Sequence, residues 1–147
     1  MFPNWIHFAC HGFQDVSDPL KSGVHLYDGC LELLEIMWQQ ILNPDLAFLS
    51  ACQTSKGDLK LAEEVVHFAA GMLAAGVVST MWNISDMHGP EFATEFYKYL
   101  LTEKGSEGLD SSQAAYALDH AVRKVQESLG DDDATFLTWI PYVHFGY

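Results

Sequence analysis

The stretch "WIHFACHGF", residues 5–13, sets a Cys-His-Gly sequence directly after a run of apolar, aromatic and β-branched residues. A run of this kind over residues 4–10 is typical of a strand buried inside a sheet. His11 would stand at the end of that strand, before a glycine that lets another backbone approach closely because it lacks a Cβ. Either His11 is a structural histidine beside a turn, or the strand presents its imidazole for chemistry.

A second stretch, "DLAFLSAC" at residues 45–52, predicts another buried strand, which ends at Cys52. Consecutive strands joined by a crossover usually lie near each other, and reactive groups gather at the carboxyl ends of parallel strands. We therefore expect His11 and Cys52 side by side at one edge. A thiol beside an imidazole is the minimal unit of cysteine nucleophile catalysis. The backbone amides of Gly12 and Cys52 would stabilise the oxyanion.

The rest of the chain alternates strand and helix patterns. Helices are predicted over residues 33–42, 59–75, 90–103 and 112–130. Further strands are predicted over residues 77–82 and 139–147, and a β-hairpin around Asp28-Gly29 within residues 24–33. This alternation predicts one α/β domain over residues 1–147, with a mostly parallel sheet and crossover helices.

The composition is that of a folded, acidic domain. Apolar residues make up 49% of the chain, enough to form a core. The formal net charge of −13 disfavours nucleic acid as a partner and favours basic peptides or basic protein faces. The sequence has neither an apolar run of about 18 residues for a membrane span nor a signal-peptide pattern. Three cysteines, an odd and sparse set, favour a cytoplasmic location over secretion.

A metal site is the other chemistry that the first stretch suggests. His7, Cys10 and His11 are the candidate ligands, but alternation along a strand directs His7 and Cys10 to opposite faces. The chain has no CxxC pair, which structural zinc sites commonly use. We therefore predict no metal and no cofactor, and we interpret Cys10 and Cys30 as packing residues.

Four blocks of the sequence together resemble a known family. In chain order they are "HFACHG", "DLAFLSACQTSKGD", "FAAGMLAAGVVSTMWNISD" and "WIPYVHFGY". They resemble the CHAT domain, a branch of the caspase-like cysteine peptidases that includes relatives of separase. The resemblance runs from residue 5 to the end of the chain. It implies an α/β/α sandwich on a mostly parallel sheet, with His11 as catalytic histidine, Cys52 as nucleophile and His7 in a supporting position.

The sequence departs from this family at its start. The caspase-like fold normally has further strands before the one that carries the histidine, and we expect this chain to lack these N-terminal strands. We expect an uncovered sheet edge, through which the chain would pair with a second copy as a homodimer or with another part of a longer protein.

A peptidase of this kind holds a substrate side chain in a pocket near the catalytic pair. The stretch "TMWNISD" follows a predicted strand, so Trp82, Ser85 and Asp86 are expected at the same rim. Asp86 would pair with an Arg or Lys of the substrate, although it would equally well cap the following helix. Asp58, in the loop after Cys52, is a rival for this role.

Three functional interpretations remain at this point. The first is a caspase-like cysteine endopeptidase that cleaves protein or peptide substrates. The second is a catalytically inactive CHAT-like scaffold or dimerisation module on the same fold. The third is a thiol-redox site formed by Cys10 and Cys52, which strand-face alternation disfavours.

Overall fold

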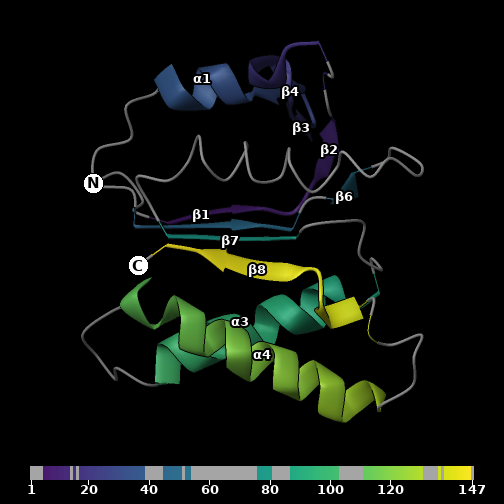
Figure 1. Ribbon diagram of the computed structural model, residues 1–147, viewed down its shortest axis with the longest axis vertical. Helices are drawn as coiled ribbons and strands as arrows, with labels where there is room; N and C mark the ends of the chain where they lie inside the picture. The colour runs from purple at the N-terminus through teal and green to yellow at the C-terminus, as the bar shows by residue number, and fades with distance from the viewer. Residues whose placement is uncertain are drawn as a thin grey trace.

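The structure is a computed structural model that describes residues 5–13, 15, 17–38, 45–50, 52–53, 76–80, 87–102, 111–130, 136 and 138–146. Within these residues the strands form two four-stranded sheets, with the strand orders β1-β5-β7-β8 and β4-β3-β2-β6. We call them the main sheet and the second sheet (Figure 1). None of the helices described is long and apolar enough to cross a membrane.

The main sheet is mostly parallel. Its strands are β1 (Trp5–Phe8), β5 (Leu46–Leu49), β7 (Gly76–Thr80) and β8 (Tyr142–Phe145). The first three run parallel, whereas β8 pairs antiparallel with β7. Two long helices, α3 and α4, are described between β7 and β8, and a second helix after a crossover helix reverses the chain direction once more. The sequence predicted the last strand over residues 139–147, but Trp139 is helical and the strand begins only after Pro141.

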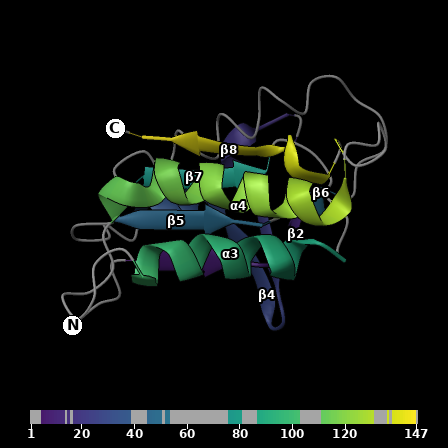
Figure 2. The ribbon, with the colours of Figure 1, turned by 90° about the horizontal axis from the view of Figure 1, so that it is seen from below.

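The two faces of the main sheet have separate cores. All four residues of β5 are buried, and their side chains alternate between the faces. Leu46 and Phe48 belong to the core beneath α3 and α4, while Ala47 and Leu49 pack with Ile36 of α1 on the opposite face. Figure 2 shows α3 and α4 side by side over the first face. The described residues therefore form the expected α/β/α arrangement.

Two amphipathic helices cover the first face. The helix α3 (Gly89–Thr102) buries Phe92, Phe96 and Leu100 at four-residue spacing, which places them on one side. The helix α4 (Ala114–Leu129) follows the short 3-10 turn η3 (Ser111–Gln113) and buries three alanines and Val125. Gly130 ends α4 at a φ of 80°, a conformation that favours glycine. The predicted helices over residues 90–103 and 112–130 are thus confirmed, whereas residues 59–75 lie outside the described part.

The second sheet contains β2 (His11–Phe13), β3 (Gly23–Leu26), β4 (Gly29–Glu32) and β6 (Cys52–Gln53). The predicted hairpin is confirmed, with a two-residue turn between β3 and β4 that pairs Leu26 with Gly29. The 3-10 helix η1 (Pro19–Lys21) precedes the hairpin, and α1 (Leu33–Trp38) follows it.

The sequence did not predict that its first strand is divided between the two sheets. The continuous strand expected over residues 4–10 ends at Phe8, and β2 begins at His11 in the second sheet. The chain after β5 makes the same transition, from Leu49 to β6 at Cys52. His11 and Cys52 therefore stand at the beginning of strands in the second sheet rather than at the end of strands in the main sheet.

Candidate functional site

The two chain segments that carry His11 and Cys52 run side by side through both sheets. In the main sheet β1 pairs with β5, and Phe8 is opposite Leu49. The amide of Ser50 donates a hydrogen bond of 2.8 Å to the carbonyl of Phe8, which continues the pairing beyond the main sheet. In the second sheet β2 and β6 pair in parallel, and His11 is the register partner of Cys52. The backbone thus brings the two expected residues together, while the side chain of Cys52 lies outside the described part.

His11 and Cys52 belong to a longer row of residues that crosses the second sheet. Register pairing across the second sheet joins His11 to His25 in β3, and His25 to Cys30 in β4. The residues Cys30, His25, His11 and Cys52 are therefore successive partners in four adjacent strands. We call this set the Cys-His row. The sequence analysis missed His25 and Cys30 as members of this row. They could not be found from the sequence, because only the strand register aligns His25 with both His11 and Cys30.

The Cys-His row lies on a face of the second sheet that is open to solvent. His11, His25 and Cys30 are all exposed. The adjacent residues Gly12 and Val24 are register partners and are buried, as expected for the opposite face. A polypeptide could therefore reach the imidazole of His11 from solvent.

Within the row, the side chains of Cys30 and His25 form a thiol–imidazole contact. The Sγ atom of Cys30 and the Nδ1 atom of His25 are 3.2 Å apart, within hydrogen-bond distance for sulfur. The His25 ring also packs against Phe13, with 4.7 Å between ring centroids. The hairpin and this ring contact together fix the position of the His25 imidazole.

His7 lies apart from the Cys-His row. Its ring contacts Phe48 and Tyr97, with centroid separations of 4.8 and 5.5 Å, on the face of the main sheet that α3 covers. Burial lowers the pKa of His7 and raises the pKa of Tyr97 to about 12. His7 therefore packs one side of its ring against Phe48 and Tyr97, while its side chain remains exposed to solvent. Across the described residues we find no group of three or more His, Cys, Asp or Glu side chains arranged to hold a metal.

The remaining predicted residues have the following positions. Cys10 is a partly buried free thiol between β1 and β2, and burial raises its pKa, in agreement with a packing role. The same prediction for Cys30 is wrong, because Cys30 is exposed. The candidate pocket residues Asp58, Trp82, Ser85 and Asp86 all lie outside the described residues. Asp58 falls between the described residues Gln53 and Gly76, and the other three fall between Thr80 and Met87.

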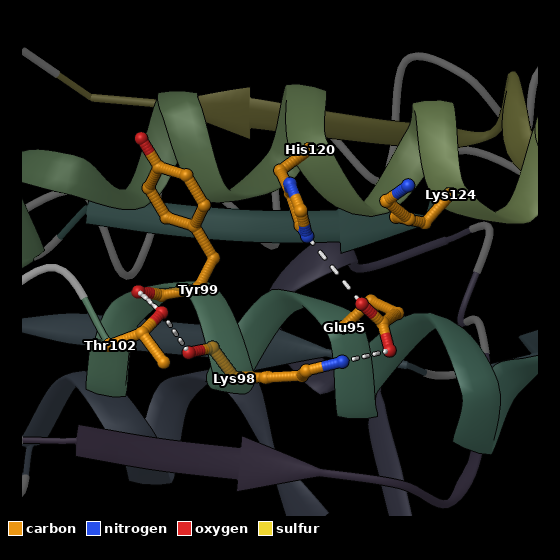
Figure 3. A pocket seen from close by; sticks show the side chains of 6 residues that line it. All are labelled: Glu95, Lys98, Tyr99, Thr102, His120 and Lys124. Atoms are coloured by element: carbon orange, nitrogen blue, oxygen red, sulfur yellow. Dashed lines mark hydrogen bonds and ion pairs between the residues drawn. The ribbon is translucent and has the colours of Figure 1, made fainter.

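A separate hollow lies on the outer surface of α3 and α4. Its volume is about 540 Å³, and it is lined by Glu95, Lys98, Tyr99, Thr102, His120 and Lys124 (Figure 3). Glu95 contacts Lys98 at 3.3 Å and His120 at 3.5 Å, and the hydrogen bond from Lys98 is the main reason for its lowered pKa. Lys124 contacts Glu127 at 2.6 Å. Each lysine that lines the hollow is therefore paired with a carboxylate.

Comparison with known proteins identifies a family. A family model described as the CHAT domain matches residues 3–147. A search of curated proteins found no match. The matched region covers nearly the whole chain and includes both sheets and the complete Cys-His row.

Proposed function

Because this chain belongs to the CHAT domain family, whose fold is caspase-like, we propose that it is a cysteine endopeptidase domain in which His11 and Cys52 form the catalytic pair. The observation that carries the proposal is the register pairing of His11 with Cys52 in adjacent parallel strands. Adjacent strands are about 4.8 Å apart, and register partners share a face of the sheet. This spacing suits a thiol–imidazole contact.

The chemistry requires only these two side chains and backbone amides. His11 takes the proton of the Cys52 thiol, and the thiolate adds to the carbonyl carbon of the scissile peptide bond. The amides of Gly12 and Cys52 donate hydrogen bonds to the resulting oxyanion. The carbon–nitrogen bond then breaks, and the leaving amine takes the proton from the His11 imidazolium. Water, activated by the same imidazole, hydrolyses the thioester and releases the second product.

The substrates proposed are peptides with a basic residue before the cleaved bond. The net charge of −13 attracts basic polypeptides over several ångströms. Asp86 remains the candidate partner of the basic side chain, with Trp82, Ser85 and Asp58 as further candidates for the pocket wall. A free-thiol nucleophile fits a reducing compartment, which supports a cytoplasmic location.

Self-association is proposed through the outer edge of the main sheet. Among the described strands, β1 is one of the two edge strands of the main sheet and pairs only with β5, so no described strand covers its other edge. Pairing with a second copy would continue the sheet. Sedimentation over a range of concentrations tests this, since the proline variant His7→Pro removes a backbone donor on the edge of β1 that faces away from β5 and should shift a dimer toward monomer. A wild-type chain that stays monomeric at every concentration would refute it.

The catalytic proposal is tested with a thiol-directed peptide electrophile that carries an arginine before the reactive group. Cys52 should be labelled selectively, and His11→Ala should slow its labelling about 100-fold, because a positioned base typically contributes this much. His120→Ala, which removes a histidine on the far side of the molecule, is the matched control and should leave the rate unchanged. Labelling of Cys52 no faster than that of Cys10 would instead favour the inactive scaffold.

A further inference from the structure

The Cys-His row contains a second thiol–imidazole pair that the proposed mechanism does not use. His25 and Cys30 are register partners in the β3–β4 hairpin, and Cys30 Sγ lies 3.2 Å from His25 Nδ1. Both residues are exposed. A small molecule can therefore reach the sulfur atom while the imidazole remains in contact with it.

The contact gives Cys30 the means to react as a thiolate. The thiolate is the nucleophilic form of cysteine, and an imidazole nitrogen at hydrogen-bond distance can take the thiol proton. The ring contact between His25 and Phe13, 4.7 Å between centroids, holds the imidazole in place. Cys10 provides the contrast, because it is partly buried and burial raises its pKa.

We propose that Cys30 is an oxidation site for small uncharged hydroperoxides, with His25 as its base. His25 Nδ1 takes the proton of the Cys30 thiol, and the sulfur attacks one oxygen of the peroxide. The sulfur–oxygen bond forms as the oxygen–oxygen bond breaks. The departing hydroxide, or the alkoxide of an organic hydroperoxide, takes the proton from the imidazolium and leaves as water or as an alcohol. The sulfur loses two electrons and the peroxide gains them, so the product is the sulfenic acid of Cys30.

The surrounding charge selects an uncharged oxidant. The chain has a net charge of −13, and Glu32 lies two residues beyond Cys30 on the same face of β4. An anionic disulfide such as oxidised glutathione is repelled by this field. Hydrogen peroxide carries no charge and is small enough to reach the sulfur.

The spacing of the row also determines what happens to the oxidised sulfur. Cys52 is three strands from Cys30, a backbone separation of about 14 Å at ~4.8 Å per strand. A disulfide requires Cα atoms within about 7 Å. Cys30 and Cys52 therefore do not form a bridge, and the sulfenic acid persists until an external thiol reduces it.

The test is trapping of sulfenic acid with dimedone while the full chain is treated with hydrogen peroxide. Mass spectrometry then gives the adduct at each cysteine separately. We expect the Cys30 adduct to form faster than the Cys10 adduct. The variant His25→Phe keeps a ring against Phe13 but removes the nitrogen, and should slow the reaction at Cys30 about tenfold with Cys10 unchanged.

Two control variants make the result decisive. His120→Phe replaces a half-buried histidine of α4 that also packs against an aromatic ring, Tyr99, and should leave Cys30 oxidation unchanged. Cys52→Ser should also leave it unchanged, which separates this inference from the proposed peptidase activity. An unaltered rate at Cys30 in His25→Phe, a Cys30 rate no higher than that of Cys10, or a Cys30–Cys52 disulfide would each overturn the proposal. If His25→Phe does not fold, His25→Gln replaces it with the same criteria.

Discussion

The two sheets of this domain have different environments. The main sheet is buried and stabilises the fold, whereas the second sheet exposes reactive side chains. In the main sheet both faces are covered, and β5 is buried along its whole length. In the second sheet one face packs inward through Val24, while the other exposes His11, His25 and Cys30. The same two chain segments supply strands to both sheets, so a rigid buried region holds the strands that present reactive groups to solvent.

The comparison predicts that truncation in the main sheet is far more costly than truncation in the Cys-His row. Phe48 is fully buried and packs against the rings of Phe96 and Tyr142, with 5.0 and 6.3 Å between ring centroids. Phe48→Ala should lower the free energy of unfolding by about 3–5 kcal/mol. Cys30→Ala should change it by less than about 0.5 kcal/mol, because the residue is exposed. Urea unfolding measures both, and equal losses would contradict the division of roles.

A pair of glycines sharpens the comparison within the hairpin. A Cβ at Gly23 would overlap the carbonyl oxygen of Leu31 in the paired strand, whereas a Cβ at Gly29 would meet nothing within 4 Å. Gly23→Ala should therefore cost about 1–3 kcal/mol of unfolding free energy, as overpacking does. It should also slow Cys30 oxidation, because it displaces β3 from β4.

Gly29→Ala is the matched control for this hairpin prediction. It places the same methyl group at the other end of the hairpin and should change stability by less than about 0.5 kcal/mol. Comparable effects of the two substitutions, on stability and on Cys30 oxidation, would show that the packing of the hairpin does not position the row.

Two partly desolvated histidines of the main sheet predict a pH dependence of stability. Burial lowers the pKa of His7 and of His144, so the folded state binds protons less readily than the unfolded chain. Stability should therefore fall as the pH drops below about 6.5, where these histidines protonate in the unfolded state. His7→Phe retains the ring contacts with Phe48 and Tyr97 and should reduce the slope of unfolding free energy against pH. An unchanged slope would show that His7 does not contribute.

The smallest effect is expected in the hollow between α3 and α4. The contacts of Glu95 with Lys98 and His120 are solvent-accessible ion pairs (Figure 3). Glu95→Gln should lower the unfolding free energy by no more than about 0.5 kcal/mol, and less at high salt. Reactivity at Cys30 and Cys52 should not change. A loss of reactivity would connect this hollow to the Cys-His row.

The main sheet and its helices were largely predictable from local patterns. The apolar run of β5, the four-residue spacing in α3 and the stop at Gly130 each follow from a strong local signal. The antiparallel direction of β8 was not predicted, because it depends on two successive helices between β7 and β8. This is a property of the chain path rather than of any short stretch.

The second sheet was only partly predictable. The hairpin was recognisable from its turn residues, but β2 and β6 have three and two residues and carry too short a pattern to identify. The pairing of His11 with Cys52 was expected from strand adjacency and the family resemblance. The contact of His25 with Cys30 was not expected, since it depends on the hairpin register and on which face is buried.

The central claim is that register pairing in the second sheet assigns each cysteine its own histidine. The most direct test measures two rates in each of two variants: labelling of Cys52 by the arginine peptide electrophile, and oxidation of Cys30 by peroxide. We predict that His11→Ala slows Cys52 labelling about 100-fold and leaves Cys30 oxidation within about twofold, whereas His25→Phe slows Cys30 oxidation about tenfold and leaves Cys52 labelling within about twofold. Loss of both reactions in either variant, or of neither in both, would contradict the account.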